Sequence, residues 1–182
     1  MIVAQPSEIW IREAEDADAE AVLRVMLEAY QQYENELPEP IWEQYKESIS
    51  ASVHEGNPKA RLVAGLDGEI VGSVQLFLSS EEAYGRADLH INSPIIRFLS
   101  VSPKVRGRGV ATLLIQESAR RSLELGSSLL YLHTSDMMQS AVQLYERLGF
   151  ERAYDKEFHN GNTLVKSYKL QLQDHPLLKQ VL

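Results

Sequence analysis

The sequence predicts an α/β fold (the mixed α+β kind), in which helices cover both faces of a mixed sheet. Apolar runs and helical repeats follow one another in the order β-α-α-β-β-β-α-β-α-β-β. Two apolar runs flank the turn pair Asp67-Gly68, which predicts an antiparallel hairpin. The run from Leu129 to Thr134 is apolar through its middle, as expected of a strand buried on both faces.

The first half of the chain is expected to hold a strand, two helices, the hairpin and a loop. Val22, Val25, Met26 and Ala29 recur at helical spacing, and two prolines separate the two helices. The predicted elements are a strand at Glu8–Glu13, a helix from Asp16 or Asp18 to about Tyr33, a helix from about Ile41 to His54, the hairpin within Ala60–Ser79 and a loop at Ser80–Ser93.

The second half is expected to alternate strands and helices around a glycine-containing loop. Gly126 and Gly149 are placed to end the two helices. The predicted elements are a strand between Pro94 and Pro103, a helix from about Gly109 to Leu125, a strand at Leu129–Thr134, a helix capped by Ser135 or Asp136, and short strands near Arg152 and at Thr163–Leu172.

Composition indicates one domain over residues 1–182, with a core at about 9–172 and a tail at 173–182. The 182 residues are 44% hydrophobic and 24% charged, which is typical of a soluble globular protein. The absence of cysteine excludes disulfides and thiolate metal sites, and the five histidines show no metal-ligand spacing, so no metal is expected. No apolar run is long enough for a membrane span, and no secretion signal is recognised, so we expect a cytoplasmic protein with no membrane partner. The net charge of −8 argues against nucleic acid and mildly favours cationic small substrates.

The loop from Arg106 to Ala111 is a candidate anion site. It follows a strand and precedes a helix, so free backbone N–H groups and the positive end of the helix dipole coincide. Gly107 and Gly109 allow a close backbone approach, and Arg106 and Arg108 add positive charge. The loop lacks the Gly-Lys-Ser/Thr of a P-loop, and Thr112 stands where a dinucleotide loop needs its third glycine.

The hexapeptide Arg106-Gly107-Arg108-Gly109-Val110-Ala111 instead fits the pattern [Arg/Gln]-x-x-Gly-x-[Gly/Ala]. Leu99, Val101 and Pro103 precede it, and "AVQLYERLGF" (141–150) follows about thirty residues later. Together these segments resemble the Gcn5-related N-acetyltransferases (GNAT), and the element order agrees from about residue 9 to 172. The resemblance implies the GNAT fold, with a central, mostly antiparallel sheet that splays open.

By this resemblance, the chain is expected to be an acetyl-CoA-dependent N-acetyltransferase. It would move an acetyl group to the primary amine of a small molecule or peptide, by direct attack in a ternary complex. The implied coenzyme contacts are the backbone of Leu99, Ser100 and Val101 on the pantetheine arm, and the backbone amides of Arg106, Gly107, Arg108, Gly109, Val110 and Ala111 on the pyrophosphate. The Val101 N–H would face the thioester carbonyl as a fixed donor.

The resemblance also suggests the groups that move protons. Tyr145 matches the family tyrosine that protonates the departing thiolate, although it also lies on the apolar face of its helix and could be a core residue. His133 stands where many members carry a glutamate base, and a histidine could serve as that base. Alternatively, His133 only lines the pocket or is satisfied by a hydrogen bond.

The acceptor side is expected near the end of the first predicted helix. Tyr30, Tyr33 and Glu34 form an aromatic and acidic stretch that suits an amine, although residues at helical spacing are more often core. Arg97 could hold a substrate carboxylate or be paired structurally. The amine itself cannot be identified from the sequence.

One departure from the family weakens an expected contact with coenzyme A. Met138 takes the place of an asparagine that often bonds the coenzyme near the start of the tyrosine helix. An alternative function is therefore a non-catalytic acyl-CoA-binding regulatory module. The oligomeric state is expected to be monomer or homodimer.

Overall fold

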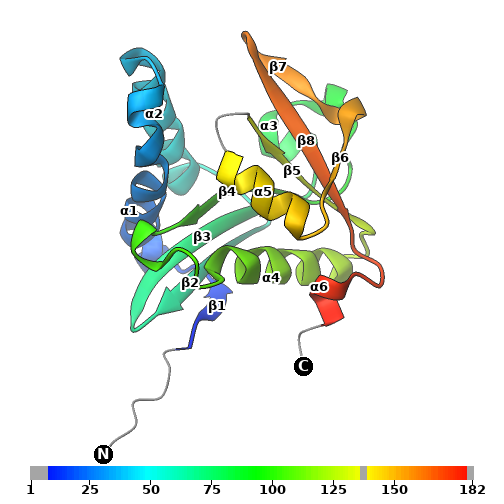
Figure 1. The fold of residues 1–182 in the computed structure, drawn as a ribbon, viewed down its shortest axis with the longest axis horizontal. Helices are drawn as coiled ribbons and strands as arrows, with labels where there is room; N and C mark the ends of the chain where they lie inside the picture. The colour runs from blue at the N-terminus through cyan, green and yellow to red at the C-terminus, as the bar shows by residue number, and fades with distance from the viewer. Residues whose placement is uncertain (1–7, 136–138, 180–182) are drawn as a thin grey trace, which may run out of the picture. The chain divides into compact units, whose positions relative to one another are not determined.

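The computed structural model describes residues 8–135 and 139–179 (Figure 1). The strands are β1 (Trp10–Glu13), β2 (Ala60–Leu66), β3 (Glu69–Phe77), β4 (Ile95–Val101), β5 (Leu129–Thr134), β6 (Glu151–Arg152), β7 (Phe158–Asn160) and β8 (Thr163–Gln171). The α-helices are α1 (Ala19–Tyr30), α2 (Glu39–His54), α3 (Ser80–Tyr84), α4 (Val110–Glu124), α5 (Gln139–Arg147) and α6 (Pro176–Lys179). Short 3₁₀ helices are η1 (Asp16–Asp18), η2 (Gln31–Glu36), η3 (Ala87–Leu89), η4 (Pro103–Val105) and η5 (Tyr154–Lys156).

Hydrogen bonding joins the strands in the order β1-β2-β3-β4-β5-β8-β6, and β7 pairs with β8. The pairs β1–β2, β5–β8, β6–β8 and β7–β8 are antiparallel. β4 and β5 run parallel, and their ladder registers Ile95 with Tyr131 and Ile96 with Leu132. The prediction of an α/β fold with a mostly antiparallel sheet flanked by helices is confirmed.

Residue contacts divide the chain into two compact units. The first unit comprises Met1–Asn57, Arg61–Val74 and Phe98–Leu114, and the second comprises Pro58–Ala60, Gln75–Arg97 and Ile115–Leu182. β3, β4 and α4 each contribute residues to both units. The expectation of a single domain over residues 1–182 stays a prediction.

In the first unit, α1 and α2 pack on β2 through one apolar cluster. Val22 and Met26 of α1, Ile49 and Val53 of α2, and Val63 of β2 are all buried in it. The helical spacing read in the sequence therefore reflects the buried face of α1. The second helix begins at Glu39 rather than Ile41, because a proline is tolerated in the first helical turn, where no intrahelical N–H bond is lost.

Gly72 of β3 sets how closely α4 approaches this strand. A Cβ atom at Gly72 would lie 2.8 Å from Val110 Cγ1, 3.1 Å from Leu114 Cδ1 and 3.2 Å from the Ser100 carbonyl oxygen. We expect Gly72→Ala to lower the free energy of unfolding by about 1–3 kcal/mol through overpacking. Urea denaturation measures this, with Ser73→Ala, which adds no atom to the strand, as the control. If the Gly72→Ala protein is as stable as the wild type, α4 can shift to accommodate the added methyl group, and the expected overpacking does not occur.

In the second unit, the segment predicted as the loop Ser80–Ser93 contains α3 and η3, so that expectation is wrong. The Ser79 hydroxyl accepts a hydrogen bond from the Glu82 N–H, and Gly85 ends α3 in the left-handed conformation. Ala83 and Leu89 are buried in a cluster with Tyr131. Because most residues of this segment are polar, its sequence lacks a clear helical repeat. It nevertheless forms a short capped helix whose apolar side faces the core. β7 (Phe158–Asn160) is a further strand that the sequence analysis did not predict.

Candidate functional site

The predicted anion loop connects β4 to α4, and the space beside its two glycines is open. The Ser102 N–H donates to the Val71 carbonyl oxygen over 2.8 Å, which anchors the start of the loop to β3. Gly107 and Gly109 have positive φ angles of 79° and 85°, and a Cβ atom on either would meet no atom within 4 Å. The loop therefore presents bare backbone in front of the α4 N-terminus, where the first helical amides lack intrahelical partners.

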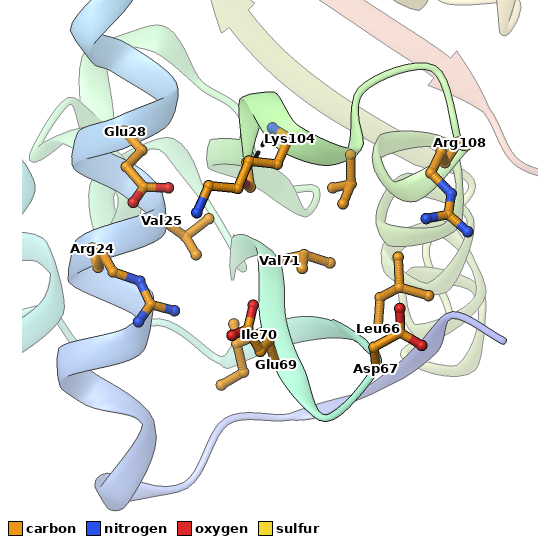
Figure 2. A pocket seen from close by; sticks show the side chains of 12 residues that line it. Arg24, Val25, Glu28, Leu66, Asp67, Glu69, Ile70, Val71, Lys104 and Arg108 are labelled. Carbon is orange, nitrogen blue, oxygen red and sulfur yellow. Dashed lines mark hydrogen bonds between the residues drawn. The ribbon is translucent and has the colours of Figure 1, made fainter. Parts of the chain in front are cut away.

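The two arginine side chains of the loop have different neighbours. The Arg106 Nη1 donates to Gln32 Oε1 of η2 over 3.3 Å. Arg108 lines a pocket of about 240 Å³ on the side of the loop that faces α1 and the β2–β3 turn (Figure 2).

Figure 2 shows that this pocket has a charged rim over an apolar base. The rim side chains are Arg24 and Glu28 of α1, Asp67 and Glu69 of the hairpin, and Lys104 and Arg108 of the loop. Val25 and Val71 contribute to the base. Among the predicted site residues in the described part of the chain, Arg108 alone lines the pocket, so the pocket does not coincide with the expected coenzyme contacts.

β4 contains one residue in the left-handed region, Phe98, just before the predicted pantetheine contacts. Phe98 has a positive φ of 54°, which is strained for an aromatic residue inside a strand. The Ser100 hydroxyl donates to the Phe98 carbonyl oxygen over 3.0 Å. Ser100 is buried, whereas Leu99 and Val101 are half-buried. This backbone conformation has no signal in the sequence, because phenylalanine is an ordinary strand residue.

The predicted acceptor residues of the first unit lie where α1 passes into η2. The ring centroids of Tyr30 and Tyr33 are 6.2 Å apart, and those of Tyr30 and Tyr45 are 6.4 Å apart. Burial raises the pKa of Tyr33, while the charge of Arg106 acts in the opposite direction. Glu34 is exposed on η2. Tyr45 therefore joins Tyr30 and Tyr33 in an aromatic cluster.

Arg97, in the second unit, is engaged by α3. Its Nη1 donates to the Ala83 carbonyl oxygen over 2.6 Å, and its guanidinium lies 4.7 Å from the Tyr84 ring centroid. A guanidinium stacked on an aromatic ring and bonded to a helix carbonyl is held as a structural group. This geometry favours the structural reading of Arg97, and its binding of a carboxylate stays a prediction.

His133, also in the second unit, is held by aromatic neighbours. Its Nδ1 lies 3.0 Å from the Tyr84 hydroxyl, with the two rings edge to face, and the Phe158 ring lies 5.5 Å away. Burial lowers the pKa of His133 to about 4, and the charge of Arg97 acts in the same direction. Such a histidine is neutral at pH 7 and binds a proton weakly. The geometry therefore favours a pocket-lining, hydrogen-bonded His133 over a His133 that acts as the general base. The base role stays a prediction.

The buried His133 is expected to make the fold sensitive to acid. Its pKa is about 4 in the folded protein and 6.5 ordinarily, so between these pH values the unfolded chain binds a proton that the folded chain does not. Stability therefore falls as the pH drops through this window, by about 2 kcal/mol between pH 7 and pH 5 from this residue. His133→Gln is expected to lose less stability over this interval, as measured by urea denaturation at both pH values.

The control for this measurement is His159→Gln, which changes an exposed histidine of β7. It should keep the wild-type loss of stability between pH 7 and pH 5. Equal losses in His133→Gln and the wild type would contradict the burial of a neutral His133.

Tyr145 lies near the end of α5 and is buried, with 7% of its surface exposed. Its ring centroid is 5.8 Å from that of Phe150, which follows the helix-ending Gly149. The contact shows how the hydrophobic end of the "LYERLGF" segment folds back on the tyrosine. Met138 and Asp136 lie outside the described residues.

The structure thus distributes the predicted residues over the two units. The loop, the end of β4 and the Tyr30–Glu34 stretch belong to the first unit, whereas Arg97, His133 and Tyr145 belong to the second. Tyr84 and Gln32 are contacts of predicted residues that the sequence analysis did not identify. Within residues 8–135 and 139–179, no group of three or more acidic or histidine side chains is arranged to hold a metal ion. No described helix has the length and apolar character to cross a membrane.

Comparison with known sequences relates most of the chain to one family. Residues 19–150 match the profile described as the acetyltransferase (GNAT) family. The probable N-acetyltransferase family 8 member 5 of Mus musculus is 34% identical over 90 residues, covering 50% of this chain and 37% of that protein. An acetyltransferase of Pectobacterium atrosepticum is 33% identical over 95 residues, covering 52% of this chain and 60% of that protein. The matched region thus covers less than two thirds of either relative.

Comparison with solved structures shows a similar fold. The PaiA N-acetyltransferase of Thermoplasma acidophilum, solved in complex with coenzyme A, superposes with a TM-score of 0.66 at 16% identity. The match covers 90% of this chain and 99% of that chain. The ribosomal-protein-S18-alanine N-acetyltransferase of Escherichia coli gives a TM-score of 0.65 at 15% identity, covering 91% and 94%.

Proposed function

The chain belongs to the acetyltransferase (GNAT) family, and from this premise we propose that it is an acetyl-CoA-dependent N-acetyltransferase. The acceptor is a primary amine of a small molecule or peptide. The observation that carries the proposal is the bare, positive-φ backbone at Gly107 and Gly109 in front of α4. A side chain at either position would fill the space through which a diphosphate must approach the amides.

The residues of the loop fit the coenzyme that the family uses. The backbone amides of Arg106 to Ala111 would hold the diphosphate, and the α4 N-terminus would add its positive potential. Three cations, Lys104, Arg106 and Arg108, lie in this short stretch of a chain whose net charge is −8. These positive charges would attract an anionic ligand to the loop.

The chemistry is assigned to backbone and side-chain groups of this chain. Coenzyme A, when bound, supplies the acetyl group as a thioester. The Val101 N–H would donate to the carbonyl oxygen as charge develops there, a contribution of about 3 kcal/mol in comparable acyl transfers. The Tyr145 hydroxyl would give its proton to the departing sulfur. The amine must lose its own proton before attack, to a base or to water, because alkyl ammonium groups have a pKa near 10.

The acceptor is proposed to be cationic before it reacts. The stretch from Glu28 to Glu47 carries six glutamates against the single cation Lys46. Tyr30, Tyr33 and Tyr45 provide aromatic rings beside this negative charge. Aromatic rings and carboxylates both favour an ammonium group. The proposed substrates are therefore amines that are positively charged at pH 7.

Initial-velocity kinetics test the proposal of direct attack. Thiol release is measured while acetyl-CoA and an active amine from a panel are both varied. Intersecting reciprocal plots, with no acetylated protein after incubation with acetyl-CoA alone, are expected of a ternary complex. Parallel plots with an acetylated protein would indicate a covalent intermediate and contradict direct attack.

A further inference from the structure

We propose that Gln32 is a positioning residue that holds the Arg106 guanidinium for the coenzyme and links the anion loop to η2. The inference rests on the proposed function, because it assigns a task to a contact of the same loop. Gln32 belongs to neither of the motifs that indicate the family, and it is separated from Arg106 by 74 positions in the chain.

The Gln32 side chain uses both ends of its amide. Its Nε2 donates to the Ala29 carbonyl oxygen over 3.1 Å, and its Oε1 accepts from Arg106 Nη1 over 3.3 Å. A carbonyl can only accept and a guanidinium can only donate, so these two partners fix the orientation of the amide. Gln32 is therefore a bridge from the last turn of α1 to the loop.

The bridge leaves Arg106 free to bind an anion. A guanidinium has five N–H donors in a planar fork, and the bond to Gln32 occupies one of them. The remaining donors keep the geometry that matches phosphate oxygens. A long, exposed arginine otherwise loses rotamer freedom when it binds, and a prior contact reduces that loss. Gln32 is thus expected to improve coenzyme binding without touching the coenzyme.

The same bridge connects the coenzyme loop to the proposed acceptor segment. Tyr33 and Glu34 directly follow Gln32 along η2, and the charge of Arg106 acts on Tyr33. A diphosphate that draws on the Arg106 charge therefore changes the electrostatic surroundings of Tyr33.

A double-mutant cycle tests the positioning role in the full chain. The variants are Gln32→Ala, Arg106→Ala and the combination, and the matched control is Gln31→Ala, the exposed neighbour on η2. Dissociation constants for coenzyme A are measured by calorimetry, and KM for acetyl-CoA and kcat are measured with an active amine. Gln32→Ala is expected to weaken coenzyme A binding about 3- to 10-fold and to raise KM with kcat unchanged.

The cycle separates positioning from a general structural effect. In the Arg106→Ala background, Gln32→Ala is expected to change the dissociation constant less than twofold, because the partner is already gone. Gln31→Ala should bind coenzyme A like the wild type. If Gln32→Ala weakens coenzyme A binding equally with and without Arg106, the inference is overturned. It is also overturned if the wild type binds coenzyme A and Gln32→Ala binds it equally well. Neither result contradicts the proposed function. A wild type that does not bind coenzyme A overturns the proposed function and this inference with it.

Discussion

Replacing Gly109 with valine is expected to weaken coenzyme A binding by at least about 100-fold and to abolish its thermal stabilisation of the protein. The φ angle of 85° strains any β-branched residue, and the new side chain would stand where the diphosphate must approach. The measurement is the thermal shift on adding coenzyme A. The wild type should gain about 2.7 kcal/mol of stability when the ligand is at 100 times its dissociation constant.

The matched control is Gly126→Val at the opposite end of α4. Gly126 has a φ of 86° and, like Gly109, no atom within 4 Å of an added Cβ. The two substitutions therefore impose similar backbone strain, and only the one at Gly109 enters the proposed coenzyme site. Retained coenzyme-induced stabilisation in Gly109→Val would show that the loop assignment is wrong. Equal losses in both variants would show that strain alone explains the effect.

Tyr145→Phe is expected to lower kcat about 100-fold while leaving the KM for acetyl-CoA within about twofold. The substitution removes the hydroxyl that is proposed to protonate the departing sulfur. It keeps the ring that packs against Phe150 at 5.8 Å, so the fold and coenzyme binding should persist. Thiol release at saturating acetyl-CoA and amine measures kcat, and coenzyme A titration verifies binding.

Tyr168→Phe serves as the control for Tyr145→Phe. Tyr168 is a buried tyrosine of β8 that lies beside Arg152 and is not proposed to act in the reaction. It should retain kcat within about twofold of the wild type, as expected of a residue that makes no transition-state contact. Full activity in Tyr145→Phe would favour the alternative reading of Tyr145 as a core residue.

Local patterns in the sequence predicted the elements whose signals lie within a short stretch of the chain. The strand Leu129–Thr134 begins and ends as expected, and the turn Asp67-Gly68 joins the two strands of the predicted hairpin. Val22 and Met26 lie in the core, as their helical spacing indicated. In each case the signal lies in neighbouring residues, as an unbroken apolar run, a turn pair or a helical repeat.

The features that the sequence did not reveal depend on contacts between distant residues. The Tyr84–His133 hydrogen bond joins residues 49 positions apart, and the Gln32–Arg106 bond joins residues 74 positions apart. The positive φ of Phe98 is imposed by the surroundings of β4 on a residue that normally avoids it. None of these features changes the local pattern, which is why the loop could be recognised but its neighbours could not.

Amine-dependent release of free thiol from acetyl-CoA is the most direct test of the proposed N-acetyltransferase activity. The wild-type chain is incubated with acetyl-CoA and a panel of cationic primary amines, and the products are identified by mass spectrometry. The proposed function predicts thiol release that requires an amine, yields the N-acetylated amine and is lost in Gly109→Val. Binding of coenzyme A without turnover of any amine in the panel would contradict it and favour a non-catalytic acyl-CoA-binding module.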